Sequence, residues 1–237
     1  MSGTATATST TAAAPTAARR GLDQAVPAIT RWSGELVDHS LVVDHGPDGA
    51  RIAYDRETPA DRVHGVLVLR CTGRQGLGEP LWEAVHFGRQ ARQMDSLLCR
   101  VCERPADRTD EGTLWLLPRP TTPGGQPRTL QPGWPEGAVT EHPPICAPHA
   151  LSSPRRCPAL RGARLVRSFE TRPFGVAGLA FDLCGDRPDH PVRGQFAMES
   201  PDLHRVAATH LLRTLAGCST VSERLLKADL ARRGKGR

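Results

Sequence analysis

The apolar positions in the first third of the chain alternate as they do in β-strands. Residues 34–45 and 50–57 contain stretches in which apolar and polar side chains alternate, and residues 64–70 form a compact run rich in β-branched side chains. The Gly-Pro-Asp-Gly sequence at 46–49 is typical of a turn. The pattern therefore predicts three short strands, of which the first two are joined by a turn.

The middle of the chain combines a helical pattern with a strand and a long loop. Residues 81–98 place apolar side chains on one face and arginines on the other, which predicts a helix with an exposed basic face. Residues 113–117 predict a short strand, and residues 118–141, rich in Pro and Gly, predict a loop insert. A brief helical turn is expected at residues 146–152.

The last third of the chain predicts a hairpin followed by two helices. Residues 163–183 contain two β-type runs separated by Arg-Pro at 172–173, which indicates a turn. Ser200 is a suitable N-cap and Gly217 a suitable C′ residue for one helix, and residues 221–232 predict another behind a capping box of Thr220 and Glu223. The fold class predicted is α+β, with short antiparallel strands, hairpins and two C-terminal helices.

Composition separates a tail from the rest of the chain. Residues 1–20 are mainly Ala, Thr, Ser and Pro without apolar periodicity, so a disordered tail is expected there. Residues 21–237 are interpreted as a single α+β domain with a zinc-binding core at 82–160. The tail lacks the apolar segment of a signal peptide, and no run approaches the roughly 20 apolar residues of a membrane span. We therefore expect a cytoplasmic protein without a membrane partner.

The charge of the chain permits a nucleic-acid partner without requiring one. The formal net charge is +6 and the pI is about 9.3, carried mainly by arginine. Arginine binds phosphate well because its planar fork reaches two oxygens, but a solvated basic surface has the same composition. Aromatic residues make up only 4% of the chain, which disfavours stacking platforms for single strands.

Four residues in the middle of the chain have the spacing of metal ligands. Cys99 and Cys102 form a Cys-x2-Cys pair, and Cys146 and His149 form a Cys-x2-His pair. Zinc prefers four thiolate or imidazole ligands in a tetrahedron, and two intervening residues let one turn aim both side chains at the same ion. Cys157 is an alternative fourth ligand. Seven cysteines without a secretion signal favour a metal or free thiols over a disulfide framework.

The run from about residue 82 to 160 resembles a group of Streptomyces-type actinobacterial proteins without an assigned activity. The matching stretches are VHFGRQARQMDSLLCRVCERPADRTDEGTLWLL and HPPICAPHALSSPRRCPALR. The resemblance implies cytoplasmic zinc-knuckle proteins. In that group the second pair is usually Cys-x2-Cys, whereas this chain has His149 at the last position, which is a residue that can also bind zinc.

The layout of a basic helix, a knuckle and a second ligand pair also resembles treble-clef and HNH endonuclease domains. Those enzymes need a general-base histidine between the pairs, and the only histidine between Cys102 and Cys146 is His142. Asp107 and Asp110 follow the first pair without a neighbouring histidine. A divergent nuclease that uses His142 is therefore the alternative hypothesis rather than the favoured one.

The favoured interpretation is a structural zinc site in a protein without catalytic residues. Four protein ligands leave no coordination position for water, which is typical of structural rather than catalytic zinc. The function predicted is a zinc-stabilised binding or regulatory module, with DNA, RNA or a protein as its partner. A purely structural accessory protein is a further alternative.

Overall fold

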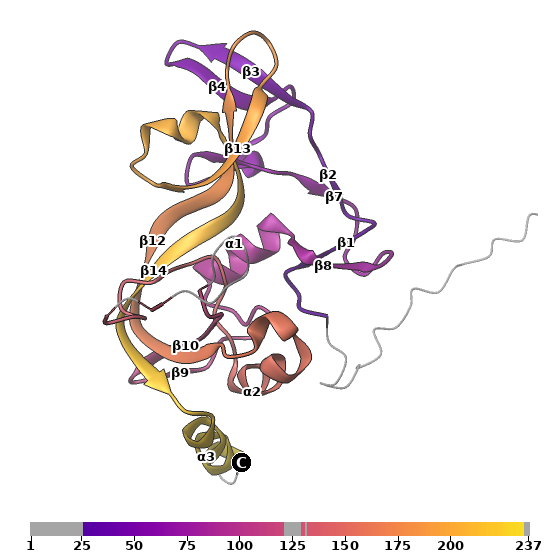
Figure 1. The fold of residues 1–237 in the computed structure, drawn as a ribbon. Helices are drawn as coiled ribbons and strands as arrows, with labels where there is room; N and C mark the ends of the chain where they lie inside the picture. The colour runs from indigo at the N-terminus through magenta and orange to yellow at the C-terminus, as the bar shows by residue number, and fades with distance from the viewer. Residues whose placement is uncertain (1–25, 121–128, 131, 235–237) are drawn as a thin grey trace, which may run out of the picture.

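The computed structural model describes residues 26–120, 129–130 and 132–234, and the predicted tail of residues 1–20 lies outside this part. A long antiparallel strand pair runs through the molecule from one end to the other (Figure 1). It consists of β12 (Arg164–Asp182) and β14 (Val206–Val221), and both strands curve along their length (Figure 1). The described chain is thus a mixed α/β structure built on a curled sheet.

The other strands of the main sheet lie beside β12 or β14 at different positions along the length of this pair. The sheet is antiparallel except for one short parallel contact between β14 and its neighbour β6. Its order is β5 (Arg62–Val63), β6 (Val66–Val68), β14, β12, β10 (Gly112–Leu117) and β9 (Arg108–Thr109), with β13 (Asp189–Ala197) beside β12 and β11 (Val139–Thr140) beside β14.

Three two-stranded sheets formed by the first third of the chain complete the β structure. They pair β1 (Thr30–Trp32) with β8 (Pro80–Val85), β2 (Leu36–Val37) with β7 (Cys71–Thr72), and β3 (Leu41–Gly46) with β4 (Gly49–Tyr54). The predicted turn at 46–49 is confirmed, because Gly46 pairs with Gly49 at the end of the β3–β4 hairpin. A positive φ of 108° at Gly49 explains the glycine at that position.

The predicted helix at 81–98 is shorter than expected. Its first residues form β8, and the helix α1 covers only Phe87–Asp95. The fully buried Gln90 explains how α1 is held, because its side-chain amide exchanges two hydrogen bonds of 2.9 Å with the backbone of Leu211 in β14. The expectation that Arg89 lies on an exposed face is wrong, since Arg89 is 7% exposed and bonds the carboxylate of Glu35.

The predicted hairpin at 163–183 is wrong, because these residues form the single strand β12. The break expected at Pro173 does not occur, because β12 changes neighbours there. On one side β12 pairs with β10 up to Ser168 and with β13 only from Gly175 onward. The missing N–H of proline therefore falls where one side of the strand is unpaired, beside a bulge.

The first of the two predicted C-terminal helices is also wrong. Ser200 does accept a hydrogen bond from Asp202 N, but it caps only a 3-10 turn, Pro201–Arg205. The following residues form β14, which pairs with β12 along almost its whole length. Their apolar positions fit a helix as well as a strand buried on both faces, so tertiary pairing decides between the two.

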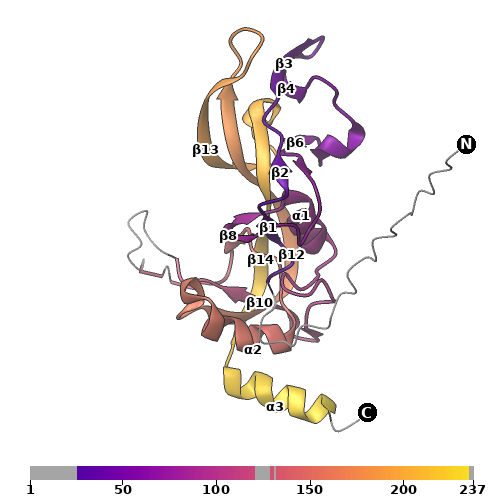
Figure 2. The ribbon, with the colours of Figure 1, turned by 90° about the vertical axis from the view of Figure 1, so that its right-hand side faces the viewer.

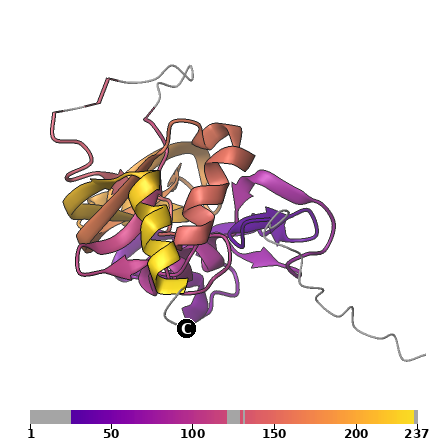
Figure 3. The same cartoon turned by 90° about the horizontal axis from the view of Figure 1, so that it is seen from below.

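The other helices lie together at one end of the molecule. The last predicted helix is present as α3 (Glu223–Gly234), although Ser222 rather than Thr220 caps it by accepting a hydrogen bond from Leu225 N. The expected helical turn at 146–152 is the longer helix α2 (Ala147–Arg156). Viewed from below, α2 and α3 lie side by side (Figure 3). None of the described helices is long and apolar enough to cross a membrane.

Candidate metal centre

The first pair of candidate ligands lies on a tight turn between α1 and β9. The backbone N–H of Cys99 donates to Arg104 O at 2.7 Å, and the N–H of Glu103 donates to Cys99 O at 2.9 Å. The N–H of Val101 also donates to Cys99 Sγ at 3.4 Å. These bonds close the turn and bring the side chains of Cys99 and Cys102 to the same side.

The second pair lies at the start of α2. Cys146 is the N-cap residue of this helix, and His149 follows in its first turn, so the two side chains share one face. The preceding residue, Ile145, pairs with the strand β10, because its N–H donates to Leu114 O at 3.0 Å. The sheet therefore determines where α2 begins and where its two candidate ligands point.

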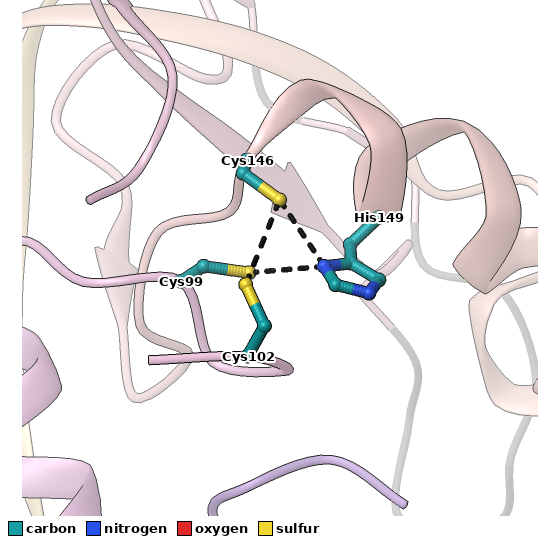
Figure 4. Close-up of side chains that lie close together, drawn as sticks. All are labelled: Cys99, Cys102, Cys146 and His149. Atoms are coloured by element: carbon teal, nitrogen blue, oxygen red, sulfur yellow. Dashed lines mark hydrogen bonds between the residues drawn. The ribbon is translucent and has the colours of Figure 1, made fainter. Parts of the chain in front are cut away.

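The four side chains converge although 43 residues separate the two pairs (Figure 4). One donor atom from each of Cys99, Cys102, Cys146 and His149 lies within 4.8 Å of all the others. His149 Nδ1 is 3.1 Å from Cys146 Sγ and 3.6 Å from Cys99 Sγ, and the Sγ atoms of Cys102 and Cys146 are 3.9 Å apart. A tetrahedron with metal–sulfur bonds of about 2.3 Å has its sulfur atoms about 3.8 Å apart. The cluster can therefore hold one metal ion.

The cluster lies largely inside the protein. Cys99 is fully buried and His149 is 3% exposed, whereas Cys102 and Cys146 are half-buried. A hydrogen bond with Cys146 lowers the pKa of the Cys99 thiol to about 4, and the same interaction raises the pKa of Cys146. The apolar side chains packed around the cluster include Leu114, Leu116, Ile145, Leu165 and Leu226. A cation that replaced the shared proton would be held in an apolar environment.

Cys157, the alternative fourth ligand, does not belong to this cluster. It is the C-cap residue of α2, eight positions beyond His149. A helix rises 1.5 Å per residue, so these two residues are about 12 Å apart along its axis. All seven cysteines are free thiols, including Cys157.

The residues considered for nuclease chemistry do not form a site with the cluster. His142 is half-buried, and its pKa is lowered to about 3 by burial and by the positive charges of Arg100 and His210. Asp107 accepts hydrogen bonds from Arg167 and Arg233, and Asp110 is exposed at the β9–β10 turn. The structure thus brings together the four predicted ligands but none of the nuclease candidates.

Sequence reasoning missed one residue beside the cluster. Arg100 lies between the two cysteines of the first pair and is only 6% exposed. A single arginine in a short loop is normally exposed, so the sequence contains no signal that would have predicted its burial.

Comparison of the chain with protein-family models, with curated proteins and with solved structures gave no match. The resemblance to Streptomyces-type proteins therefore stays a prediction, and the case for a metal centre rests on the geometry of the four side chains.

Proposed function

We propose that this protein is a non-catalytic binding module stapled by one structural zinc ion. The observation that carries the proposal is the convergence of four protein donors within 4.8 Å, which would complete a tetrahedral shell without water around a bound ion. Three thiolates and one imidazole are soft ligands that suit zinc better than magnesium or calcium. A closed shell does not activate a substrate, so the ion stabilises the fold.

The arrangement of elements around the cluster supports a treble-clef-like site. The turn carrying Cys99 and Cys102 is followed by the β9–β10 hairpin, and the second pair begins the helix α2. Knuckle, hairpin and helix occur in this order in treble-clef domains. The ion would join the turn to α2, two segments far apart in the sequence.

The endonuclease alternative has less support from the geometry. Its base would be His142, which lies half-buried near Arg100 and His210 rather than beside a carboxylate in an open cleft. The carboxylate of Asp107 is already engaged by two arginines. We therefore favour binding without hydrolysis.

The distribution of charge favours a nucleic acid as the partner. Residues 155–164 and 223–234, called the basic segments here, contain eight of the chain's 31 Lys and Arg but only two of its 25 Asp and Glu. The remaining chain has 23 residues of each sign, so the basic segments account for the whole net charge of +6. They comprise the end of α2 and all of α3, which lie side by side (Figures 2 and 3). Such a local excess of arginine suits phosphate groups.

Replacement of two arginines in the basic segments should weaken binding to duplex nucleic acid in a salt-dependent way. Arg161 and Arg224 are exposed, and neither has an ion-pair partner among the described residues. The double variant Arg161→Gln/Arg224→Gln should bind duplex DNA or RNA more weakly. The slope of log affinity against log salt should fall by about 2, since each phosphate contact contributes about 0.9. Titrations of labelled duplexes at several salt concentrations measure both quantities.

The matched control removes the same charge elsewhere. Arg74 and Arg187 are exposed and lie outside the basic segments, so Arg74→Gln/Arg187→Gln should leave the salt slope unchanged. An equal loss of affinity in both double variants would show that the basic segments are not the binding surface. If the zinc-loaded protein bound neither DNA nor RNA at low salt, the nucleic-acid partner itself would be rejected. Metal analysis of the same preparation tests the zinc separately.

A further inference from the structure

Arg100 is a buried cation without a conventional partner. Its side chain is 6% exposed, and its Nη2 atom is buried without a hydrogen-bond acceptor. Within the described ranges no carboxylate lies within 4 Å of its guanidinium. Burial of an unpaired charge costs a large free energy, so buried arginines are normally paired with an anion.

The other two buried arginines in the described part of the chain follow this rule. Arg89 Nη2 lies 2.8 Å from an oxygen of Glu35, and Arg167 Nη2 lies 2.6 Å from an oxygen of Asp107. Each of these carboxylates is itself less than 10% exposed at its side chain. Arg100 is therefore an exception within its own fold, and an anion other than a carboxylate must offset its charge.

The groups around Arg100 indicate where that anion is. The sulfur atoms of Cys99, and then of Cys157, are the groups that interact with the Arg100 guanidinium and can offset its charge. The third neighbour, His142, is neutral because its own pKa is lowered to about 3. Sulfur is thus the only source of negative charge found near this guanidinium among the described residues, and Cys99 is the stronger of the two.

The charge of a metal-loaded cluster matches that of one arginine. A divalent ion carries two positive charges, and three thiolates with one neutral imidazole contribute three negative charges. The loaded centre therefore has a net charge of −1. We propose that the Arg100 guanidinium is the buried counter-ion of a divalent metal centre formed by Cys99, Cys102, Cys146 and His149. This inference rests on the proposed function, because it requires the structural metal site.

The charge of Arg100 distinguishes a counter-ion from a residue that only fills space. With metal bound, the charges offset each other. Loss of the Arg100 charge should therefore weaken metal binding, whereas a residue that merely fills space could be replaced by an uncharged side chain of similar volume without this loss.

The test compares metal affinity among variants of the full-length protein. Arg100→Met keeps much of the side-chain volume but removes the charge, and it should weaken zinc binding by about 10- to 100-fold, as loss of groups next to metal ligands commonly does. Arg100→Lys keeps the charge and should stay within a few-fold of the original affinity. Competition with a chromophoric chelator gives the affinities, and the Co²⁺ spectrum reports whether three thiolates still bind.

Two control variants test whether a loss of metal affinity comes specifically from the buried charge of Arg100. Arg161 is exposed, five residues beyond the end of α2, and has no ion-pair partner among the described residues. Arg161→Met therefore removes an equal charge that water already screens, and the affinity should change less than about three-fold. Cys157→Ser should not change the affinity if the metal centre is the anion. Melting of metal-free and loaded samples adds a second measurement. The gain in melting temperature on loading should be smaller for Arg100→Met than for the original protein.

The outcomes separate this inference from the proposed function. Unchanged affinity in Arg100→Met, an equal loss in Arg161→Met, or a loss in Cys157→Ser matching that of Arg100→Met would each overturn the counter-ion role. An equal loss in Arg100→Lys and Arg100→Met would also overturn it. If the original protein binds neither zinc nor cobalt, the proposed metal site is wrong. The counter-ion role is then also wrong, because no anionic metal centre exists for Arg100 to offset.

Discussion

Removal of the metal is expected to unfold the part of the protein around α2. The candidate ligands join a turn after α1 to the start of α2, and the apolar side chains packed around them include Leu226 of α3. Without an ion, three thiol groups remain in this apolar cluster, and the turn is held to the segment before α2 by apolar packing and by hydrogen bonds such as Arg100 N–H to Pro144 O at 3.1 Å. Binding of structural zinc contributes about 10–16 kcal/mol to the folding of zinc-finger peptides, so even a fraction of this value would dominate the stability of a domain.

Thermal melting with and without a strong chelator measures this effect. The chelated protein should melt at a much lower temperature, and amide hydrogen exchange should accelerate first in residues 99–160. Cys99→Ser should reproduce the result, because Cys99 is fully buried in the cluster. Cys184→Ser is the matched control, since Cys184 is an exposed free thiol outside the cluster. An identical melting curve for metal-free and loaded protein would show that the ion does not stabilise the fold.

Replacement of Asp107 by Asn is expected to have the second-largest effect on stability. Asp107 Oδ1 accepts a hydrogen bond of 2.6 Å from Arg167 Nη2, and the Arg167 side chain is only 2% exposed. Arg167 also donates to Gly112 O, so it joins β12 to the β9–β10 hairpin. Asp107→Asn removes the negative charge and leaves a buried guanidinium, which typically costs about 3–5 kcal/mol.

Urea denaturation of Asp107→Asn measures this cost. The control is Glu111→Gln, because Glu111 also lies near Arg167, at 3.8 Å, but its side chain is 73% exposed. Exposed ion pairs contribute about 0–1 kcal/mol, so this variant should unfold at nearly the original urea concentration. Equal losses in the two variants would mean that burial does not determine the strength of the Arg167 ion pair.

Part of this structure follows from short segments of sequence. The spacing within each ligand pair requires only one turn, so Cys99 with Cys102 and Cys146 with His149 were predictable as pairs. The β3–β4 hairpin was predictable for the same reason, because its turn sequence acts over a few residues. The helix α3 was also predicted, although its cap is Ser222 rather than the expected Thr220. These features need no information from distant parts of the chain.

The long strands could not be predicted in this way. Residues 206–221 have apolar positions that fit a helix or a strand, and they form β14 because β12 offers hydrogen-bond partners along nearly its full length. Pro173 suggested a chain reversal, but β12 continues because its neighbour on one side changes at that point. In both cases the deciding partner is distant in the sequence.

The sequence by itself determined which side chains can bind a metal, because ligand type and local spacing are properties of short segments. Only the tertiary structure decided that the two pairs meet, that Cys157 stays outside the cluster, and that Arg89, Arg100 and Arg167 are buried. Burial depends on what packs against a residue, and here the packing partners come from strands and helices far along the chain. The charge of Arg100 acquires its proposed role only through that packing.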